Sequence, residues 1–321
     1  MLRQPPLLSV CIPTYHQPQA LERLLRAVLP QLTSEVEVVI RDDSVEDASE
    51  KIVHSFKNTN SVRYFRGKKE GLDVAILFLT REARGKYIWW FGDDLMVEGS
   101  LEKVLEFLKS NPQTSFLYIN SKQTGSSSPN GHEVPNRKFL NGEEAVTELV
   151  DMLGFITATI FEREKALPHL FAAEKHIGSA WVCLFIILSV LTEAGEKHAL
   201  GEPLIISEPR DPAHPTWYDG FTVFAINFFH ILSAFKGKFS NGTIRKTLAK
   251  NFDGIWKGIL VYRAKGYAHG LGAKTVTIPL IARYYWSFPG FWISLPFLAL
   301  PRSVARILYA IYLKVRSPFR S

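Results

Sequence analysis

Short apolar runs rich in β-branched residues alternate with amphipathic stretches through the first 120 residues. The runs that predict strands cover residues 7–12, 36–40, 62–65, 87–91 and 115–120. The stretches between them, residues 18–32, 46–58, 71–84 and 100–108, have helical character; in the first, Leu21, Leu24, Leu25, Val28 and Leu29 share one face. This alternation predicts right-handed βαβ units and an α/β fold with a mainly parallel sheet flanked by helices.

The pattern changes after residue 120. Residues 121–138 are rich in Ser, Gly, Pro and Asn and predict a loop. Residues 141–200 are expected to be mostly helical, and their apolar run at 181–191 is too short to span a bilayer, which indicates a buried helix. Residues 203–215 carry four prolines and predict an extended connector.

Charge is distributed unevenly along the chain. The formal net charge is +7 and the pI is about 9.3, which favours an anionic partner: a nucleic acid, nucleotide phosphates or an anionic membrane. Residues 236–321 hold a single acid, Asp253, so the excess positive charge belongs to the C-terminal part. Two distant cysteines in apolar runs indicate buried thiols, and the N-terminal residues lack the apolar core of a signal peptide. We therefore expect a cytosolic catalytic part.

Polar residues follow three of the predicted strands directly. Thr14 follows the first, Asp42 and Asp43 the second, and Asp93 and Asp94 the fourth. In parallel sheets ligands bind at the carboxyl ends of the strands, so these side chains are expected to meet at one edge. Alone, each pair has an ordinary explanation, a helix N-cap at Asp43 and a surface turn at Asp93. Their joint placement instead favours binding of a nucleotide.

A nucleotide sugar needs its base hydrogen-bonded, its diphosphate neutralised and its leaving group stabilised. One or two carboxylates that hold Mg²⁺ or Mn²⁺ meet the last two needs. Asp93 and Asp94 suit this role, and Asp42 or Asp43 suits the base and ribose. Spacings of Cys and His that bind zinc are absent from the sequence. The expected cofactor is therefore Mg²⁺ or Mn²⁺.

Three segments resemble family-2-type glycosyltransferases of GT-A (Rossmann-like) fold: residues 9–15 (SVCIPTY), 37–44 (EVVIRDDS) and 83–94 (ARGKYIWWFGDD). The abequosyltransferase-like branch of bacterial O-antigen assembly is most similar, with a Gly-Leu-Asp (71–73) before the metal motif and a Phe-Ile-Thr (155–157) opening the acceptor half. Ala75 stands where this branch has Asn. The donor contacts that the resemblance implies are Pro13, Thr14, Tyr15, Asp42, Asp43, Asp73 and Asp93. It implies Asp94, with Asp93, as metal ligands.

The resemblance also implies inverting transfer of a sugar to a hydroxyl, assisted by a catalytic base. Relatives carry this base as an acidic pair, which residues 140–200 lack. Glu174 and His176 are the candidates, although an ordinary surface start of a helix explains them equally, and Asp211 and Asp219 are lesser candidates. Basic residues around the third strand are expected near the diphosphate or on a solvated face: Arg63, Arg66, Lys68 and Lys69.

The C-terminal stretch between Arg283 and Arg302 is uncharged, aromatic and interrupted by Pro289 and Pro296. Residues 302–316 then alternate basic and apolar side chains, as a basic amphipathic helix does. Together they predict an in-plane membrane anchor; the alternative is packing on the catalytic domain or a dimer partner. An anchor on the inner leaflet would bring the enzyme to a polyprenyl-linked acceptor. We expect a cytoplasmic protein, peripheral on the inner face of the membrane.

These expectations divide the chain into three parts: a nucleotide-sugar-binding half (1–120), an acceptor-binding half (121–215) and a helical basic segment (216–321). The expected activity is an inverting glycosyltransferase of cell-surface polysaccharide or O-antigen synthesis, acting on a glycan or lipid-linked acceptor. A nucleotidyltransferase is the alternative enzyme, but residues 13–16 lack the glycine-rich loop of that class. A non-catalytic basic module that binds membranes or nucleic acid leaves the acids at the strand ends unexplained. We expect no nucleic-acid partner.

Overall fold

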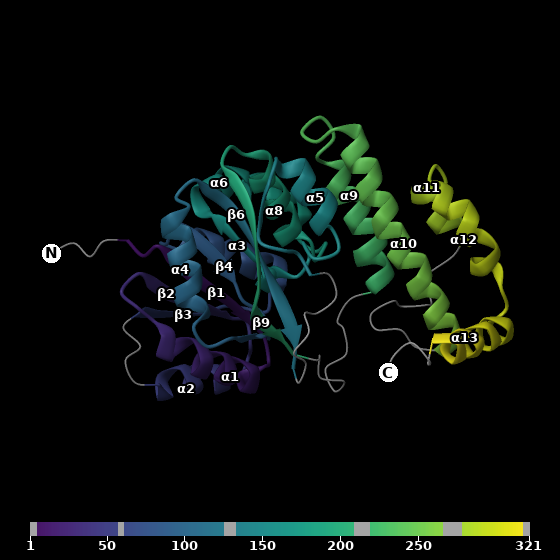
Figure 1. Cartoon of the computed structure of the whole chain (residues 1–321). Coiled ribbons are helices and arrows are strands. Elements are labelled where there is room, and N and C mark those ends of the chain that lie inside the picture. Colours follow the sequence, from purple (N-terminus) through teal and green to yellow (C-terminus); the bar gives the residue numbers. More distant parts are fainter. Residues whose placement is uncertain (1–4, 57–60, 125–132, 209–218, 266–277, 317–321) are drawn as a thin grey trace. The chain divides into compact units, whose positions relative to one another are not determined.

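A computed structural model describes residues 5–56, 61–124, 133–208, 219–265 and 278–316 (Figure 1). The chain divides into two compact units, Met1–Arg210 and Asp211–Ser321. The boundary expected between residues 120 and 121 falls inside one strand of the first unit, so the two expected halves share a sheet. The boundary expected between residues 215 and 216 lies outside the described residues.

The first unit contains a single sheet with the strand order β3-β2-β1-β4-β8-β6-β9-β5, and β7 pairs with β9. Its first four strands are parallel: β1 (Leu8–Thr14), β2 (Val36–Asp42), β3 (Val62–Arg66) and β4 (Tyr87–Trp90). β1 and β2 are buried along almost their whole length, as expected of strands covered on both faces. The predicted βαβ arrangement is confirmed here.

The remaining strands make the sheet mixed. β8 (Thr159–Glu162) lies antiparallel between β4 and β6 (Thr114–Gln123), and β9 (Glu196–Ser207) runs parallel to β6. Two short strands, β5 (Leu95–Met96) and β7 (Arg137–Phe139), pair antiparallel with β9. The helical expectation for residues 141–200 is therefore wrong at β8 and at the start of β9. The expected connector from residue 203 is wrong as far as residue 207.

Helices of the first unit lie on the sheet and around one buried helix. They are α1 (Pro18–Val28), α2 (Ala48–Ser55), α3 (Leu72–Glu82), α4 (Ser100–Ser110), α5 (Gly142–Leu149), α6 (Arg163–Ala166), α7 (Leu170–Ala173) and α8 (Val182–Thr192). α8 is apolar on every side and buried from Val182 to Leu191, which confirms the predicted core helix. It packs against α3, α5 and α6 and against β6 and β8.

The second unit is helical. It contains a π-helical stretch (Thr222–Asn227), α9 (Phe228–Ser233), α10 (Asn241–Lys265), α11 (Ile278–Tyr285), α12 (Pro289–Ala299) and α13 (Arg302–Arg316). Tyr285 is buried, stacks on Phe252 with 4.7 Å between ring centroids, and donates a hydrogen bond to the carbonyl of Ala225. The predicted helix at residues 302–316 is confirmed.

Among the helices within the described ranges, none is by itself both long enough and apolar enough to cross a bilayer. Pro289–Ala299 and Ser303–Ile311 reach that length and composition only as a pair, and they are bent by 110° at the break between them.

Candidate active site

The carboxyl ends of β1 and β2 lie side by side. Thr14 is in register with Asp42, and the backbone N–H of Asp43 donates to the carbonyl of Thr14 at 3.0 Å. β4 follows on the other side of β1, where the N–H of Phe91 donates to the carbonyl of Cys11 at 2.9 Å. The parallel register therefore brings the three predicted strand-end clusters to one edge of the sheet.

Asp42 is fully buried and organises the turn after β2. Its Oδ1 accepts the backbone N–H of Ser44 at 2.9 Å, and its Oδ2 accepts the hydroxyl of Tyr64 at 2.8 Å. Burial of Tyr64, together with its hydrogen bond to Asp42, raises the pKa of that phenol well above its usual range. The Asp42 carboxylate thus has two protein donors, and a contact with a nucleobase would use its remaining lone pairs.

Asp43 is held by a buried cation. Arg41, whose side chain is 6% exposed, donates from Nε to Asp43 Oδ1 at 2.8 Å and pairs with Glu70 as well. The Arg41 guanidinium also stacks over Phe78, 4.7 Å from its ring centroid. Gly67 passes so close that an added Cβ would lie 2.1 Å from Asp43 Oδ1, so only glycine fits there. The turn after β2 is therefore a rigid, internally paired structure.

The loop after β1 presents an aromatic side chain beside this turn. Tyr15 is 40% exposed, and Lys69 Nζ lies 5.6 Å from its ring centroid. The neighbouring His16 is tied down, since its backbone N–H donates to Ser44 Oγ at 2.7 Å. Pro13, Thr14 and Tyr15 therefore border the turn that carries Asp42 and Asp43, as a donor-binding loop requires.

Two of the basic residues expected near the diphosphate are engaged elsewhere. Arg63 donates to the carbonyl and carboxylate of Glu82, and it lies opposite Val39 near the start of β3, away from the carboxyl end of that strand. Arg66 pairs with Glu50 and donates to the carbonyl of Val45. The expectation for Arg63 is wrong, and Lys69 is the basic group that faces Tyr15.

The turn after β4 is built around Asp94, which is 8% exposed. Thr157 Oγ1 donates to Asp94 Oδ2 at 2.6 Å and accepts the backbone N–H of Gly92 at 3.1 Å. Trp89 Nε1 in turn donates to the carbonyl of Thr157 at 2.7 Å. A residue 63 positions later in the sequence thus fixes the orientation of the Asp94 carboxylate.

Burial raises the pKa of Asp94 to about 6, and the negative charge of Asp93 acts in the same direction. Hydrogen bonds from Thr157, from the backbone at Glu208 and from Ser207 oppose this rise. Ser207 ends β9, so the end of that strand also belongs to this site. Asp93 itself is exposed.

Asp93 and Asp94 fit a divalent ion of the Mg²⁺ type. Such an ion takes oxygen ligands and is commonly bound by one or two carboxylates, with water and substrate phosphates as its other ligands. Across the described parts of the chain, no group of three or more His, Cys, Asp and Glu side chains forms a closed metal cage. The same residues include no Lys or Arg in an ion pair with Asp94. Burial makes the Asp94 carboxylate costly to ionise, and a bound cation would offset that cost.

Asp73 forms its hydrogen bonds with residues outside the turns after β2 and β4. Its Oδ2 accepts the N–H groups of Gly178 and Ala180 at 2.8 and 2.9 Å, and its Oδ1 accepts that of Val182 at 3.2 Å. Burial raises the pKa of Asp73, and these backbone hydrogen bonds act against the rise. Its expected contact with the donor stays a prediction, whereas its attachment to the start of α8 is a structural fact.

The two base candidates share one 3₁₀ turn, Glu174–His176. Glu174 forms an ion pair with Arg81. His176 is half-buried with its ring 4.6 Å from that of Phe185, and burial lowers its pKa below the usual value. Within the described residues, neither side chain has a hydrogen bond to the turns at Asp42 or Asp94.

The two lesser candidates lie outside the first unit. Asp219 accepts hydrogen bonds from the backbone and hydroxyl of Thr222, and Asp211 is outside the described residues. Sequence reasoning missed Thr157 and Ser207 as members of the site. The tripeptide that contains Thr157 was noted, but its bond to Asp94 depends on a long-range contact that no local pattern signals.

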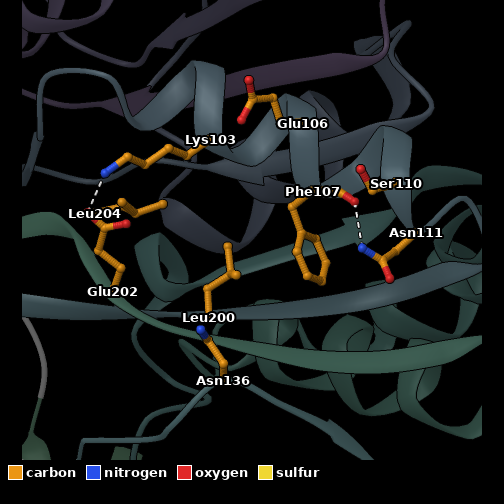
Figure 2. A pocket seen from close by; sticks show the side chains of 9 residues that line it. All are labelled: Lys103, Glu106, Phe107, Ser110, Asn111, Asn136, Leu200, Glu202 and Leu204. Atoms are coloured by element: carbon orange, nitrogen blue, oxygen red, sulfur yellow. Dashed lines mark hydrogen bonds and ion pairs between the residues drawn. The ribbon is translucent and has the colours of Figure 1, made fainter.

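A cavity of about 370 Å³ lies elsewhere on the first unit, between α4 and the middle of β9. Figure 2 shows Lys103 reaching Glu202 on one side and Asn111 donating to the carbonyl of Phe107 on the other. Its lining residues are Lys103, Glu106, Phe107, Ser110, Asn111, Asn136, Leu200, Glu202 and Leu204. None of them belongs to the carboxyl-edge turns, so this cavity is not the candidate active site.

The mixed sheet, with two acidic turns at the carboxyl edge of its parallel strands, has the arrangement of a GT-A-type fold. The family model described as Glycosyl transferase family 2 matches residues 9–167, which include both acidic turns and Thr157. The resemblance to family-2 glycosyltransferases expected from the sequence is confirmed over these residues.

Relatives in sequence are glycosyltransferases of bacteria. The abequosyltransferase RfbV of Salmonella typhimurium is 26% identical over 223 residues, covering 62% of this chain and 66% of the relative. The chondroitin synthase of Escherichia coli is 27% identical over 139 residues, 42% of this chain and 20% of that protein. The chain thus spans only part of the length of these relatives.

Solved structures support the same fold. TarS residues 1–349 of S. aureus in complex with UDP-GlcNAc is similar with a TM-score of 0.63 and 15% identity, over 81% of this chain and 76% of that chain. At this level of identity the similarity shows the fold.

Proposed function

We propose that this protein is an inverting, metal-dependent glycosyltransferase that moves a hexosyl or deoxyhexosyl group from a nucleotide sugar to a hydroxyl of a cell-surface glycan or lipid-linked oligosaccharide. The observation that carries the proposal is Asp94, buried and oriented by Thr157 at the edge that also holds Asp42 and Asp43. The relatives named abequosyltransferase and chondroitin synthase favour a polysaccharide acceptor, and the UDP-GlcNAc bound to TarS favours a nucleotide-sugar donor.

The donor is held by groups on the first three parallel strands. The exposed ring of Tyr15 offers a stacking surface for the nucleobase, and Lys69 beside it offers a cation for the diphosphate. Asp42 and Asp43, fixed by Tyr64 and Arg41, present carboxylate oxygens to the base and ribose. Asp94 and Asp93 would hold Mg²⁺ or Mn²⁺, which as a Lewis acid stabilises the departing diphosphate.

The acceptor hydroxyl requires a proton acceptor. His176 suits this role better than Glu174, because burial keeps the imidazole neutral near pH 7 while Glu174 is paired with Arg81. In the transfer, the acceptor oxygen bonds to the anomeric carbon as the bond from that carbon to the diphosphate oxygen breaks. The proton of the acceptor passes to the imidazole, and the nucleoside diphosphate leaves.

The test is calorimetric titration with a panel of nucleoside diphosphates, with and without Mn²⁺, followed by hydrolysis assays with the matching nucleotide sugars. We expect one nucleotide to bind only with the metal and its sugar to be slowly hydrolysed. Metal-independent binding of an oligonucleotide, with no metal-dependent binding of any nucleotide, would falsify the proposal.

The second unit carries the proposed membrane contact. Along α13, Val304, Ile307, Leu308 and Ile311 recur at helical spacing on one face and are all exposed, with Ile307 at 60%. α12 adds Trp292, Ile293 and Phe297, which are exposed as well. An uncovered apolar helix face with aromatic residues beside it is typical of helices that lie in the membrane interface.

The charge of this region favours an anionic lipid surface as the occupant of that face. Residues 236–321 contain one acid among many Lys and Arg, so these helices are attracted to the negative lipids of an inner leaflet. We therefore place the protein on the cytoplasmic face of the membrane, where a polyprenyl-linked acceptor would be within reach.

Cosedimentation of the full chain with phosphatidylglycerol vesicles tests this contact. The variant Ile307→Ser/Ile311→Ser should bind at least about tenfold more weakly, because two side chains leave the interface. Leu140→Ser, at an 89% exposed position in the first unit, is the matched control and should bind as the wild type does. Equal binding by all three proteins, or a dimer that the double variant turns into a monomer, would overturn the membrane proposal.

A further inference from the structure

Two helices of the first unit converge on one buried carboxylate. Asp73 lies in the first turn of α3 and is 6% exposed, and its oxygens accept three backbone N–H groups from residues 178–182, where α8 begins. The first N–H groups of a helix have no partner within the helix, and its positive dipole end favours an anion. Asp73 therefore caps the first N–H group of α8, at Val182, and holds the turn before it through Gly178 and Ala180, from a helix that starts more than 100 positions earlier.

The segment that Asp73 holds has a strained backbone. Gly178 has φ +90°, which glycine adopts without strain, whereas Ala180 has φ +63°, a left-handed conformation that residues other than glycine rarely adopt. The hydrogen bonds from Gly178 and Ala180 to one carboxylate oxygen lock this shape. Without an acceptor at this place, the strained turn would lose the bonds that maintain it.

The same segment also contacts the part of the chain that leads to the proposed metal site at Asp93 and Asp94. Trp181 lies against Gly154 so closely that an added Cβ at Gly154 would be 2.5 Å from the indole ring. Gly154 lies three residues before Thr157, and the hydroxyl of Thr157 donates to Asp94. Asp73 bonds to the backbone on both sides of Trp181, Trp181 lies against Gly154, and the short segment from Gly154 leads to Thr157 and so to Asp94.

We propose that Asp73 is a positioning residue of the transferase: it fixes residues 178–182, and through Trp181 it supports the turn that holds Asp94. The inference rests on the proposed function and changes the role of Asp73 from a ligand of the donor to a clamp between two halves of the site. A carboxylate is required because all three bonded groups are N–H donors. An Asn would direct its own NH₂ group at one of them.

Amide hydrogen exchange of the full chain without ligands tests the clamp directly. In Asp73→Asn, peptides spanning residues 174–184 should exchange at least about tenfold faster, while peptides spanning residues 36–44 stay unchanged. Ala180→Gly placed in the Asp73→Asn background should recover part of the protection, because glycine adopts the left-handed conformation without strain. Asp47→Asn, at the exposed N-cap position of α2, is the matched control and should leave both peptides unchanged.

Binding and kinetics separate a clamp from a donor ligand. For Asp73→Asn we expect affinity for the nucleoside diphosphate in the presence of Mn²⁺ to fall by less than about fivefold, because Asp94 keeps its hydroxyl donor Thr157. The kcat for transfer should fall about 50-fold or more as the metal turn loses its support. A tenfold loss of nucleotide affinity with unchanged exchange at residues 174–184 would overturn the clamp and restore the donor-ligand role. Exchange needs no substrate, so the clamp is decided by this measurement even if the protein transfers no sugar.

Discussion

The two acidic turns occupy the same edge of one sheet but differ in how their carboxylates are satisfied. In the turn after β2, Asp42 accepts hydrogen bonds from Ser44 and Tyr64, and Asp43 is paired with the buried Arg41. In the turn after β4, Asp94 is buried with neutral donors, and no ion pair among the described residues involves it. One turn is completed by the protein, and the other has a carboxylate suited to a cation from solution.

The two turns therefore differ in how far their form and their charge depend on bound ligands. The first turn keeps its form with or without a donor, because Arg41 pairs with Asp43 and the carboxylate of Asp42 holds Ser44 and Tyr64. The second turn places an acid where burial disfavours ionisation, and a divalent ion would relieve that cost. The Asp42–Asp43 turn is preorganised, and the Asp93–Asp94 turn depends on a cation.

The largest expected effect distinguishes the two acids of the second turn. Asp94→Ala should lower kcat by on the order of 10³-fold and remove the effect of Mn²⁺ on nucleotide binding, because it deletes the oriented ligand. Asp93→Ala should cost about tenfold, since water can replace an exposed ligand. Titration of both variants with Mn²⁺ and nucleoside diphosphate provides the measurement. Equal losses in the two variants would contradict the ranking of Asp94 over Asp93.

The next effect concerns the stability of the first turn. Arg41→Met removes the partner of a buried carboxylate and should lower the free energy of unfolding by about 3–5 kcal/mol. Arg26→Met breaks an exposed pair with Glu22 on α1 and should cost about 0.5 kcal/mol or less. Urea unfolding at neutral pH compares the two variants. A small loss in Arg41→Met would show that the first turn does not depend on its internal ion pair.

Sequence reasoning succeeded where local pattern and structure coincide. The strands ending at Thr14, Asp42 and Trp90 are predictable because each is a largely apolar run followed by a polar turn, and parallel pairing brings such ends together. Helix α8 was predicted from an apolar run that is buried on all sides. The family resemblance added the roles of the acids, which spacing alone leaves open.

Sequence reasoning failed where structure depends on distant partners. β8 has four residues and becomes a strand because β4 and β6 lie on either side of it. β9 contains Gly201 and Pro203, which usually interrupt strands, and its register with β6 shifts around Asn120, opposite Pro203. Thr157 enters the site through the same topology, since it lies two residues before the start of β8. Its contact with Asp94 was therefore not predictable from local sequence.

A smaller effect is expected on the pH dependence of the free energy of unfolding, which should differ between variants at Asp94 and at Asp43. The folded protein holds the pKa of Asp94 near 6, above its ordinary value of 3.8. The protonated Asp94 side chain therefore stabilises the folded state fully below about pH 4, and this contribution is lost as the pH rises through 6. At about 1.4 kcal/mol per pH unit, the cost of ionising Asp94 reaches about 3 kcal/mol at pH 8. Asp94→Asn avoids this cost.

In metal-free buffer, Asp94→Asn should therefore be more stable than wild type at pH 8, by up to about 3 kcal/mol, and the gain should shrink as the pH falls below 6. Asp43→Asn should have the opposite sign at pH 8, because it leaves the buried guanidinium of Arg41 without its carboxylate. Urea midpoints across this pH range measure both. Destabilisation of similar size in the two variants would remove the distinction between the turns.

The smallest expected effect concerns the hydrogen bond that the uncharged Thr157 hydroxyl donates to Asp94. Thr157→Val keeps the shape of the side chain but removes the hydroxyl that joins Gly92 to Asp94, and it should weaken Mn²⁺-dependent nucleotide binding by about tenfold. Thr157→Ser keeps the hydroxyl and should retain most of the affinity. Thr159→Val, two residues away and equally buried, loses only a hydrogen bond to the carbonyl of Ile156 and is the matched control. If Thr157→Val binds Mn²⁺ and nucleotide as tightly as Thr159→Val does, Asp94 is oriented by the backbone of its own turn, and the second turn is more like the first than its hydrogen bonds indicate.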